Sequence, residues 1–260
     1  MQLPLYQIDA FTNRLFAGNP AAVCPLDEWP ADAVLQSIAA ENNLSETAFF
    51  SGRDGEYRLR WFTPAAEIDL CGHATLASAY VIFRYLEPAL GRAEFQTRSG
   101  ILTVEKQGDL LAMDFPARPA DPCPLPEALT AGLGISPLAV FRSRDYMAIL
   151  DSEETVRGLR PRMEELVKLD CTGIIATAPG RESDFVSRFF APRVGVPEDP
   201  VTGSSHCTLI PYWSERLGKK DLHSIQVSPR GGELFCAHLG DRVRIAGRAV
   251  TYLEGIIHTD

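Results

Sequence analysis

The strongest constraint on the fold of this chain is an internal repeat. Residues 60–64 read RWFTP, and residues 188–192, which lie 128 positions later, read RFFAP. Each motif is followed by a glycine that opens an apolar stretch. These glycines are Gly72 in the first half and Gly203 in the second, 131 positions apart. The spacing of the two pairs indicates that one structural unit occurs twice.

Two further matches follow in the same order. Gln96 and Gln226 are 130 positions apart, and the Gly-Asp steps at 108–109 and 240–241 are 132 positions apart. Ordered matches with such small drifts indicate the duplication of a unit about half the chain long. Two related lobes that face one another would form a cleft, and clefts between lobes are common ligand sites.

The composition is that of a folded protein with little affinity for polyanions. Apolar residues make up 45% and charged residues 23% of the 260 residues, which are globular averages. Asp and Glu outnumber Lys and Arg by 34 to 25, and the resulting net charge of −9 argues against nucleic acid or an anionic membrane as a partner. No uninterrupted apolar run reaches the length of a membrane span.

Cysteine usage and the first residues favour a cytoplasmic protein. The six cysteines are scattered without a C-x-x-C pair, and residues 1–9 lack the basic start and long apolar core of a secretory signal. We therefore expect reduced thiols and a cytoplasmic location. His223, His238 and His258 lie in unrelated segments without metal-ligand spacing, so no metal site is expected.

Periodicity predicts alternating strands and a few helices in the first half. A helix is expected to begin near Pro30 and to end at Asn42-Asn43, and residues 73–86 have the length of a helix with almost no polar face. A helix that is apolar all round is buried on all sides. The expected strands are 8–11, 21–24, 47–50, 57–61, 101–104 and 110–113, the last two joined as a hairpin.

The second half repeats this plan. Strands are expected at 174–177 and 185–190, and a mostly apolar helix at 204–217 that is kinked or delayed by Pro211. Five prolines between 116 and 126 predict a linker without regular structure. The expected fold is α+β with two pseudo-symmetric lobes, residues 1–116 and 117–260. Each lobe is a mixed, mostly antiparallel sheet wrapped around a central buried helix.

Both predicted buried helices begin at a glycine followed by polar residues. Gly72 precedes His73, and Gly203 precedes Ser204 and Ser205. A helix start offers unpaired backbone N–H groups and the positive end of the helix dipole, so it can bind a carboxylate or an enolate-like oxygen. A glycine before a helix is also an ordinary turn residue. The occurrence of the pattern in both halves favours a ligand site.

Glu46 is the candidate acid–base group. It stands where a helix ends and an apolar strand begins, close to Leu44, Ala48 and Phe49. A carboxyl in an apolar pocket has a raised pKa, which suits it to take and return protons near neutral pH. A solvated rim position is the competing interpretation. The corresponding stretch of the second half, 172–174, holds no acid.

Five motifs now follow one another along most of the chain. They are DAFT with FAGNPAAV at 9–12 and 16–23, NLSETAF at 43–49, RWFTP at 60–64, DLCGHAT at 69–75 and GVPEDPVTGS at 195–204. In this order they resemble the phenazine-biosynthesis (PhzF-like) isomerase family. The resemblance implies the two-lobed diaminopimelate epimerase-like fold, a homodimer, and a last strand near 252–257 that returns to the first lobe.

The resemblance also implies acid–base chemistry without a cofactor. In this family a glutamate moves a proton between carbons of trans-2,3-dihydro-3-hydroxyanthranilate, and Glu46 matches that glutamate. His73 and Asp199 match residues that hold polar groups of the substrate or assist the transfer. The remaining matches are expected to bind the substrate carboxylate, and they are Gly72, Gly203, Ser204 and Ser205.

The chain departs from the epimerase branch of this fold at one helix start. The epimerases resemble enzymes that use two thiols in catalysis, with one cysteine on each lobe. Here Cys71 occupies the first position and Thr202 the second, while Cys207 comes roughly one helical turn after Gly203. Inversion of a stereocentre needs two bases, so a two-thiol racemase is disfavoured. Packing is the ordinary role of Cys71 and of His206, and a part in the site stays open for both.

Three functions are therefore compatible with the sequence. The first is an isomerase that acts on a small cyclic or amino acid-like carboxylate. The second is an epimerase or racemase of the same fold, and the third is a ligand-binding or interaction protein without catalysis. The combination of Glu46, His73 and Asp199 favours the first. The physiological substrate and any connection with phenazines are not encoded in these motifs.

Overall fold

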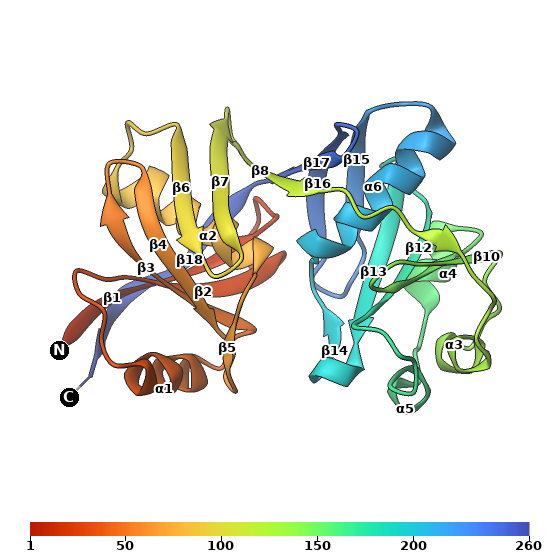
Figure 1. The fold of residues 1–260 in the computed structure, drawn as a ribbon, viewed down its shortest axis with the longest axis horizontal. Helices are drawn as coiled ribbons and strands as arrows, with labels where there is room; N and C mark the ends of the chain where they lie inside the picture. The colour runs from red at the N-terminus through yellow and green to blue at the C-terminus, as the bar shows by residue number, and fades with distance from the viewer. Residues whose placement is uncertain (260) are drawn as a thin grey trace. The chain divides into compact units, whose positions relative to one another are not determined.

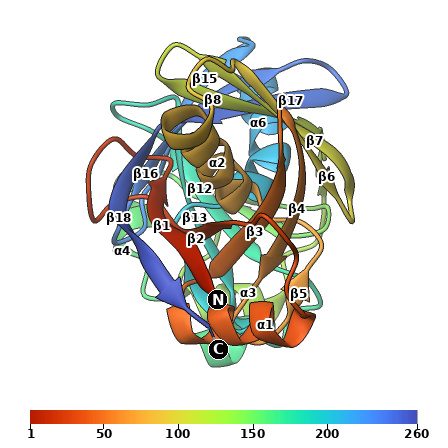
Figure 2. The ribbon, with the colours of Figure 1, turned by 90° about the vertical axis from the view of Figure 1, so that its left-hand side faces the viewer.

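The computed structural model describes residues 1–259, and these form two compact units. Unit 1 comprises residues 1–114 together with the chain from Ala246 onward, and unit 2 comprises residues 115–245. The expected division at 116–117 lies close to the first boundary, and the family resemblance implied that the last strand returns to the first lobe. In the structure, β18 (Ala249–His258) pairs antiparallel with β1 (Gln2–Ala10) of unit 1. The pairing of Gln2 with His258 brings the described ends of the chain together (Figure 2).

The sheet of unit 1 combines parallel and antiparallel pairs (Figure 1). Next to β1 lies β2 (Asn19–Pro25), which is antiparallel to it. Then β2 and β3 (Glu46–Arg53) are parallel, β3 and β4 (Glu56–Phe62) antiparallel, β4 and β6 (Arg92–Thr97) parallel, and β6 and β7 (Gly100–Gln107) antiparallel. The short β5 (Glu67–Ile68) also pairs with β4. β8 (Leu110–Pro116) forms the predicted hairpin with β7.

Unit 2 repeats the same sequence of pairings. β11 (Tyr146–Ile149) and β12 (Ile174–Pro179) are parallel, and β12 and β13 (Phe185–Ala191) are antiparallel. β13 and β15 (Asp221–Gln226) are parallel, and β15 and β16 (Gly232–His238) are antiparallel. The short β14 (Val196–Asp199) pairs with β13 as β5 pairs with β4. The repeat in the sequence therefore corresponds to a repeated strand connectivity. β17 (Arg242–Gly247) follows the turn at 240–241.

One long buried helix occurs at the same point of each unit. α2 (Gly72–Val81) stands between β5 and β6, and α6 (Gly203–Leu217) stands between β14 and β15. The apolar segment predicted as one helix over 73–86 is α2 continued by a π-helical turn, η1 (Ile82–Leu86). α6 contains Pro211 and runs without interruption from 203 to 217. In Figure 2, α2 lies against the strands of unit 1.

The duplicated arginines tie the short strands to the sheet in the same way. Arg60 on β4 forms a two-pronged ion pair with Glu67 on β5, at 2.7 Å from Nε and 2.8 Å from Nη2. Arg188 on β13 forms the same pair with Glu198 on β14, also at 2.7 and 2.8 Å. Each guanidinium lies over the phenylalanine two residues later on its own strand, at 5.1 Å and 5.0 Å from the ring centre. The RWFTP and RFFAP motifs thus encode the same ion pair and the same arginine–phenylalanine stacking in both units.

Other elements cover the sheets. α1 (Asp32–Asn42) ends at the predicted Asn42-Asn43 pair, where Asn43 has a left-handed conformation, and its apolar face packs on β3 and β4. The proline-rich stretch from 116 to 126 is less irregular than expected, since β9 (Asp121–Pro122) pairs with β10 (Ala139–Arg142). The remaining helices belong to unit 2: α3 (Glu127–Leu133), α4 (Glu153–Gly158), α5 (Met163–Leu166) and the 3₁₀ turn η2 (Pro192–Val194).

Candidate active site

Glu46 and His73 meet in the interior of unit 1. Glu46 is the first residue of β3, and His73 is the second residue of α2. Oε2 of Glu46 lies 3.0 Å from Nε2 of His73, and the side chains are only 16% and 8% exposed. Neither atom has a hydrogen-bond partner elsewhere in residues 1–259. The two predicted catalytic groups of this unit therefore form a buried contact of their own.

The other ring nitrogen of His73 contacts two different side chains. Nδ1 lies 3.5 Å from Sγ of Cys71 and 3.3 Å from Nδ2 of Asn19. The imidazole thus stands between a thiol on one side and a carboxyl on the other. Both atoms of a primary amide can serve such a ring, since the NH2 donates to a bare nitrogen and the oxygen accepts from a protonated one. Asn19 is therefore suited to both protonation states of His73.

The segment before β2 positions Asn19. Asp9 is buried, and its carboxylate accepts a hydrogen bond from the main-chain N–H of Phe16 at 3.0 Å. Gly18 has a positive φ of 67°, and a Cβ there would come within 2.2 Å of the main-chain oxygen of Ala10. Only glycine fits this turn. The sequence offered Gly-Asn-Pro both as a family motif and as a simple turn, and the structure shows that Asn19 also contacts His73.

Electrostatics favour a protonated His73. Burial lowers the pKa of His73, but the adjacent Cys71 and Glu46 side chains raise that pKa well above its usual range. Burial raises the pKa of the Cys71 thiol. The contacts of His73 with Cys71 and Glu46 therefore favour a protonated imidazole. The pair can exchange one proton over a single 3.0 Å contact.

Glu46, Cys71 and His73 are also the one group of potential metal ligands among residues 1–259, with all ligand atoms within 4.8 Å of one another. Their arrangement does not suit a single ion. Cys71 faces Nδ1 of the imidazole, whereas Glu46 faces Nε2. A metal binds one ring nitrogen in the plane of the ring. An ion beside Cys71 and Nδ1 would therefore lie across the ring from Glu46.

The start of α6 in unit 2 is a polar network without a counterpart of Glu46. Thr202 Oγ1 donates to Oδ2 of Asp199 at 2.5 Å instead of capping the helix. Gln226 accepts from the main-chain N–H of Thr202 at 2.8 Å and donates to the main-chain oxygen of Asp199 at 2.7 Å. This clamp holds Asp199 beside the helix start. Gln226 was noticed as a member of the repeat and not as a site residue.

The serines of this helix start differ. Ser204 is half-buried, and Nη2 of Arg144 donates to its hydroxyl at 3.2 Å. Ser205 is 1% exposed and donates its hydroxyl proton to the main-chain oxygen of Thr202 at 2.8 Å. Its hydroxyl proton is therefore used within the helix start, and its role in substrate binding stays a prediction. Arg144 was not recognised in the sequence, where it stands in no motif.

His206 is part of the internal structure of unit 2. Nδ1 donates to the main-chain oxygen of Thr202 at 2.9 Å, and Nε2 accepts from the hydroxyl of Ser224 at 2.9 Å. The side chain is fully buried, and burial lowers its pKa to about 4. His206 is thus a neutral, fully hydrogen-bonded histidine that fixes the main chain at the start of α6.

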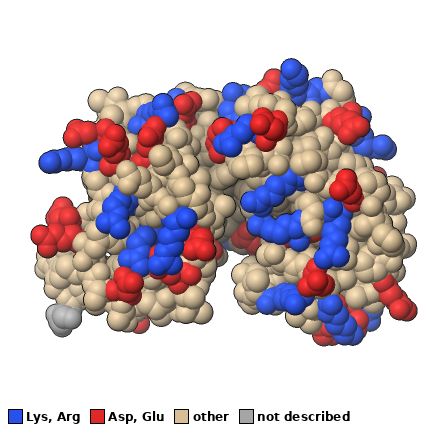
Figure 3. All heavy atoms as spheres, in the orientation of Figure 1, with Lys and Arg blue, Asp and Glu red and all other residues tan. Residues whose placement is uncertain are grey.

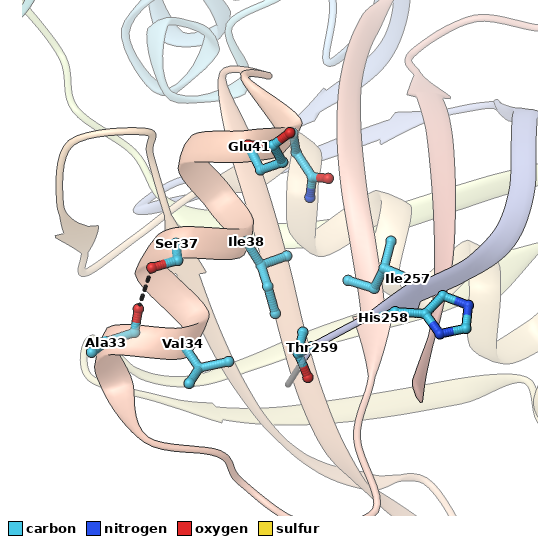
Figure 4. A pocket seen from close by; sticks show the side chains of 9 residues that line it. Ala33, Val34, Ser37, Ile38, Glu41, Ile257, His258 and Thr259 are labelled. Atoms are coloured by element: carbon cyan, nitrogen blue, oxygen red, sulfur yellow. Dashed lines mark hydrogen bonds between the residues drawn. The ribbon is translucent and has the colours of Figure 1, made fainter. Parts of the chain in front are cut away.

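A separate groove of about 460 Å³ lies between α1 and the end of β18 (Figure 4). Most of its lining is apolar or small, including Val34, Ile38 and Ile257. None of the lining residues belongs to the group around His73. On the face shown in Figure 3, basic and acidic side chains are mixed on each unit, as the modest net charge predicts. No helix in residues 1–259 has both the length and the apolar character needed to cross a bilayer.

Comparison with known proteins gives a consistent assignment. Residues 8–255 match the family model of phenazine biosynthesis-like proteins. An uncharacterized isomerase of Pseudomonas aeruginosa is 53% identical and aligns over 99% of this chain and 100% of its own. A PhzF-family crystal structure from Enterococcus faecalis is 45% identical, with a TM-score of 0.98 and full coverage of both chains.

The fold extends to enzymes with little sequence identity. The structure of a predicted epimerase from P. aeruginosa is 19% identical, with a TM-score of 0.74 over 99% of this chain and 100% of that one. At that identity the likeness concerns the fold alone, and it agrees with the expected α+β epimerase-like architecture. With its buried Glu46–His73 pair and its match over almost the whole length, the chain belongs to the phenazine biosynthesis-like (PhzC-PhzF) family and is an isomerase of that family.

Proposed function

We propose that this isomerase moves a proton between two carbons of a small cyclic or amino acid-like carboxylate without a cofactor. The observation that carries the proposal is the buried 3.0 Å contact between Glu46 and His73, whose facing atoms have no other hydrogen-bond partner in residues 1–259. A carboxylate of this kind can take a proton from one carbon and return a proton to another.

The proton balance of this reaction is simple. The Glu46 carboxylate removes a proton from one carbon, and the electron pair of the broken C–H bond passes into the conjugated system of the substrate. The resulting Glu46 carboxyl then returns the proton to a second carbon, so a double bond shifts and nothing is oxidised or reduced. His73, as the protonated partner, supports the charge of Glu46 before the transfer and after it.

The remaining roles follow the family motifs. Asp199 holds a polar group of the substrate or assists the transfer, and its position is fixed by Thr202 and Gln226. The N–H groups of the first helical turns carry no side-chain cap at either Gly72 or Gly203. Uncapped N–H groups of this kind, together with the Ser204 hydroxyl, suit a substrate carboxylate. The protein is proposed to act as a homodimer.

Proton exchange in deuterated water tests this function. Wild type and Glu46→Gln would be incubated with trans-2,3-dihydro-3-hydroxyanthranilate and a panel of small amino and cyclic carboxylates, and followed by NMR. We expect deuterium at carbon with the wild type and a loss of roughly 10³-fold in Glu46→Gln, the size of a general acid–base contribution. Equal exchange by both proteins would contradict the role of Glu46.

The same experiment separates the alternatives. Inversion of a stereocentre without movement of a double bond would identify an epimerase, which Thr202 disfavours because it stands where a second thiol is expected. Ligand binding by the wild type without exchange on any carboxylate of the panel would favour a binding protein. Glu46→Gln keeps the size and shape of the side chain, so a lost activity would reflect the lost carboxylate.

A further inference from the structure

The loop between β10 and β11 lies along the first turns of α6 in unit 2. Oγ of Ser143 is 3.2 Å from Oγ1 of Thr208, and Nη2 of Arg144 donates to Oγ of Ser204 at 3.2 Å. Positions 204 and 208 are four residues apart and therefore share one face of the helix. These two contacts fix residues 143–144 against that face, next to the start of α6.

Asp145 holds the Arg144 guanidinium in place. Oδ1 and Oδ2 of Asp145 lie 3.4 Å from Nε and 3.1 Å from Nη2 of Arg144. The Asp145 side chain is 3% exposed, whereas that of Arg144 is 40% exposed. A buried carboxylate thus anchors a guanidinium that remains accessible. Among residues 1–259, no acceptor bonds to Nη1 of Arg144, so its two N–H groups are available to a ligand.

The main chain at Arg118 contacts α6 because of Pro211. Proline has no N–H, so the main-chain oxygen of Cys207 lacks its helical partner. The main-chain N–H of Arg118 donates to that oxygen at 2.8 Å. Nη1 of Arg118 is buried and has no hydrogen-bond partner in residues 1–259. A buried donor without an acceptor is costly, and an anion is the partner that best relieves the cost.

Electrostatics connect the two guanidinium groups. Burial raises the pKa of the Cys207 thiol, while the positive charges of Arg118 and Arg144 act in the opposite direction on that pKa. Both charges therefore lie within electrostatic reach of the same residue in the first two turns of α6. The carboxylate of Asp145 pairs with Arg144, and the Arg118 guanidinium remains as a second positive charge near Cys207.

We propose that Arg144 and Ser204 bind the carboxylate of the substrate and that Arg144 determines the preference of the enzyme for an acid. The inference rests on the proposed function and adds a charged residue to it. A planar guanidinium presents paired N–H groups that match the two oxygens of a carboxylate. The anchored geometry of Arg144 reduces the freedom lost on binding. Arg118 supplies further positive charge.

Binding of a matched acid and amide tests this inference. Anthranilate and anthranilamide would be titrated by calorimetry or NMR into wild type, Arg144→Gln and Arg144→Lys. We expect the wild type to prefer the acid and Arg144→Gln to lose that preference by about 10- to 100-fold, the size of charge-assisted hydrogen bonds. Arg144→Lys should recover part of it, since lysine keeps the charge but lacks the fork.

Two controls keep the result specific. Arg142→Gln removes the same charge from the same segment, where the side chain contacts Tyr146 and the main-chain oxygen of Asp170, and it should leave the preference unchanged. Glu46→Gln should abolish deuterium exchange and keep the preference for the acid. A preference retained in Arg144→Gln would overturn the inference. A wild type that binds acid and amide equally, or binds neither, would also overturn it.

The two proposals fail in distinguishable ways. A wild type that prefers the acid through Arg144 but exchanges no proton with any carboxylate would overturn the proposed function and support the carboxylate site. Exchange that depends on Glu46, together with an acid preference that survives Arg144→Gln, would do the opposite.

Discussion

The starts of α2 and α6 occupy the same place in a repeated strand order, yet they carry different chemistry. In unit 1, Cys71 and His73 flank the helix glycine, both are buried, and His73 contacts Glu46. In unit 2, Thr202 and Ser204 take these positions and offer hydroxyls. Both units have the same strand order and the same Arg–Glu ion pair, while Glu46 and His73, the proposed proton-transfer groups, lie in unit 1.

The strand registers show why unit 2 holds no acid at the corresponding point. Glu46 precedes Thr47, which pairs with Phe62, and Gly173 precedes Ile174, which pairs with Phe190. Gly173 is therefore the counterpart of Glu46. A Cβ at Gly173 would come within 2.1 Å of the Phe189 ring. A side chain at this point of unit 2 would therefore collide with the Phe189 ring.

The largest expected effect concerns the Arg–Glu ion pair that occurs in both units, Arg60–Glu67 and Arg188–Glu198. Arg188 is 8% exposed and also donates to the main-chain oxygens of Val156 and Leu159, whereas Arg60 is 18% exposed and its additional partner Asp32 is 71% exposed. Breaking a buried pair leaves a charge and two carbonyls unsatisfied. We expect Arg188→Gln to lower the free energy of unfolding by about 3 kcal/mol and Arg60→Gln by about 1 kcal/mol.

Urea unfolding of both variants provides the measurement, with Arg58→Gln as the control. Arg58 lies on the same strand as Arg60, is exposed and stacks only near Trp29, so its loss should cost little. Equal losses in Arg60→Gln and Arg188→Gln would show that the extra carbonyl contacts of unit 2 contribute nothing. The deeper burial of Arg188 would then not make its ion pair more stabilising than that of Arg60.

The next effect tests the space at Gly173. Gly173→Ala should destabilise the protein by about 2 kcal/mol, because the added methyl group displaces the Phe189 ring from a tightly packed site. Combined with Phe189→Leu, the same change should cost less than the sum of the two single changes. Thermal unfolding of the two single variants and the double variant measures this coupling. Strict additivity would mean that the ring does not limit the space at Gly173.

The sequence predicted many of the strands and helices because the patterns that indicate them involve neighbouring residues. The RWFTP and RFFAP motifs, the apolar helix before position 86 and the hairpin turn at 108–109 depend on neighbouring residues, and the structure confirms the elements they predict. Helix α3 was not predicted because its seven residues are too few for a periodic pattern.

The site was predicted unevenly for a related reason. Glu46 and His73 stand in motifs, and the structure brings them together across 27 residues of chain. Asn19, Gln226 and Arg144 act through contacts between distant segments, which no local pattern reports. Ser205 stands in the same motif as Ser204, but its position on the helix directs its hydroxyl to the main-chain oxygen of Thr202. A motif shows which residue types are candidates for the site, whereas the direction of each side chain depends on the packed structure.

The smallest expected effect separates the two buried histidines. The pKa of His206 is lowered to about 4 by burial, whereas that of His73 is raised. A histidine with a lowered folded-state pKa contributes stability that is complete above its unfolded pKa of about 6.5 and is lost as the pH falls toward 4. A raised pKa acts in reverse, so that the contribution of His73 is complete below about pH 6.5 and is lost as the pH rises through its folded-state pKa.

Lowering the pH from 7.5 to 5.5 should therefore reduce the contribution of His206 to the free energy of unfolding by about 1 kcal/mol. Urea unfolding at both pH values would measure the loss in wild type and in His206→Gln, whose amide can still donate to the main-chain oxygen of Thr202. The variant should be less stable than wild type at pH 7.5 and should lose about 1 kcal/mol less than wild type on acidification. A variant with the same pH dependence as wild type would show that folding does not lower the pKa of His206. The contrast between a raised histidine pKa at α2 and a lowered one at α6 would then be wrong.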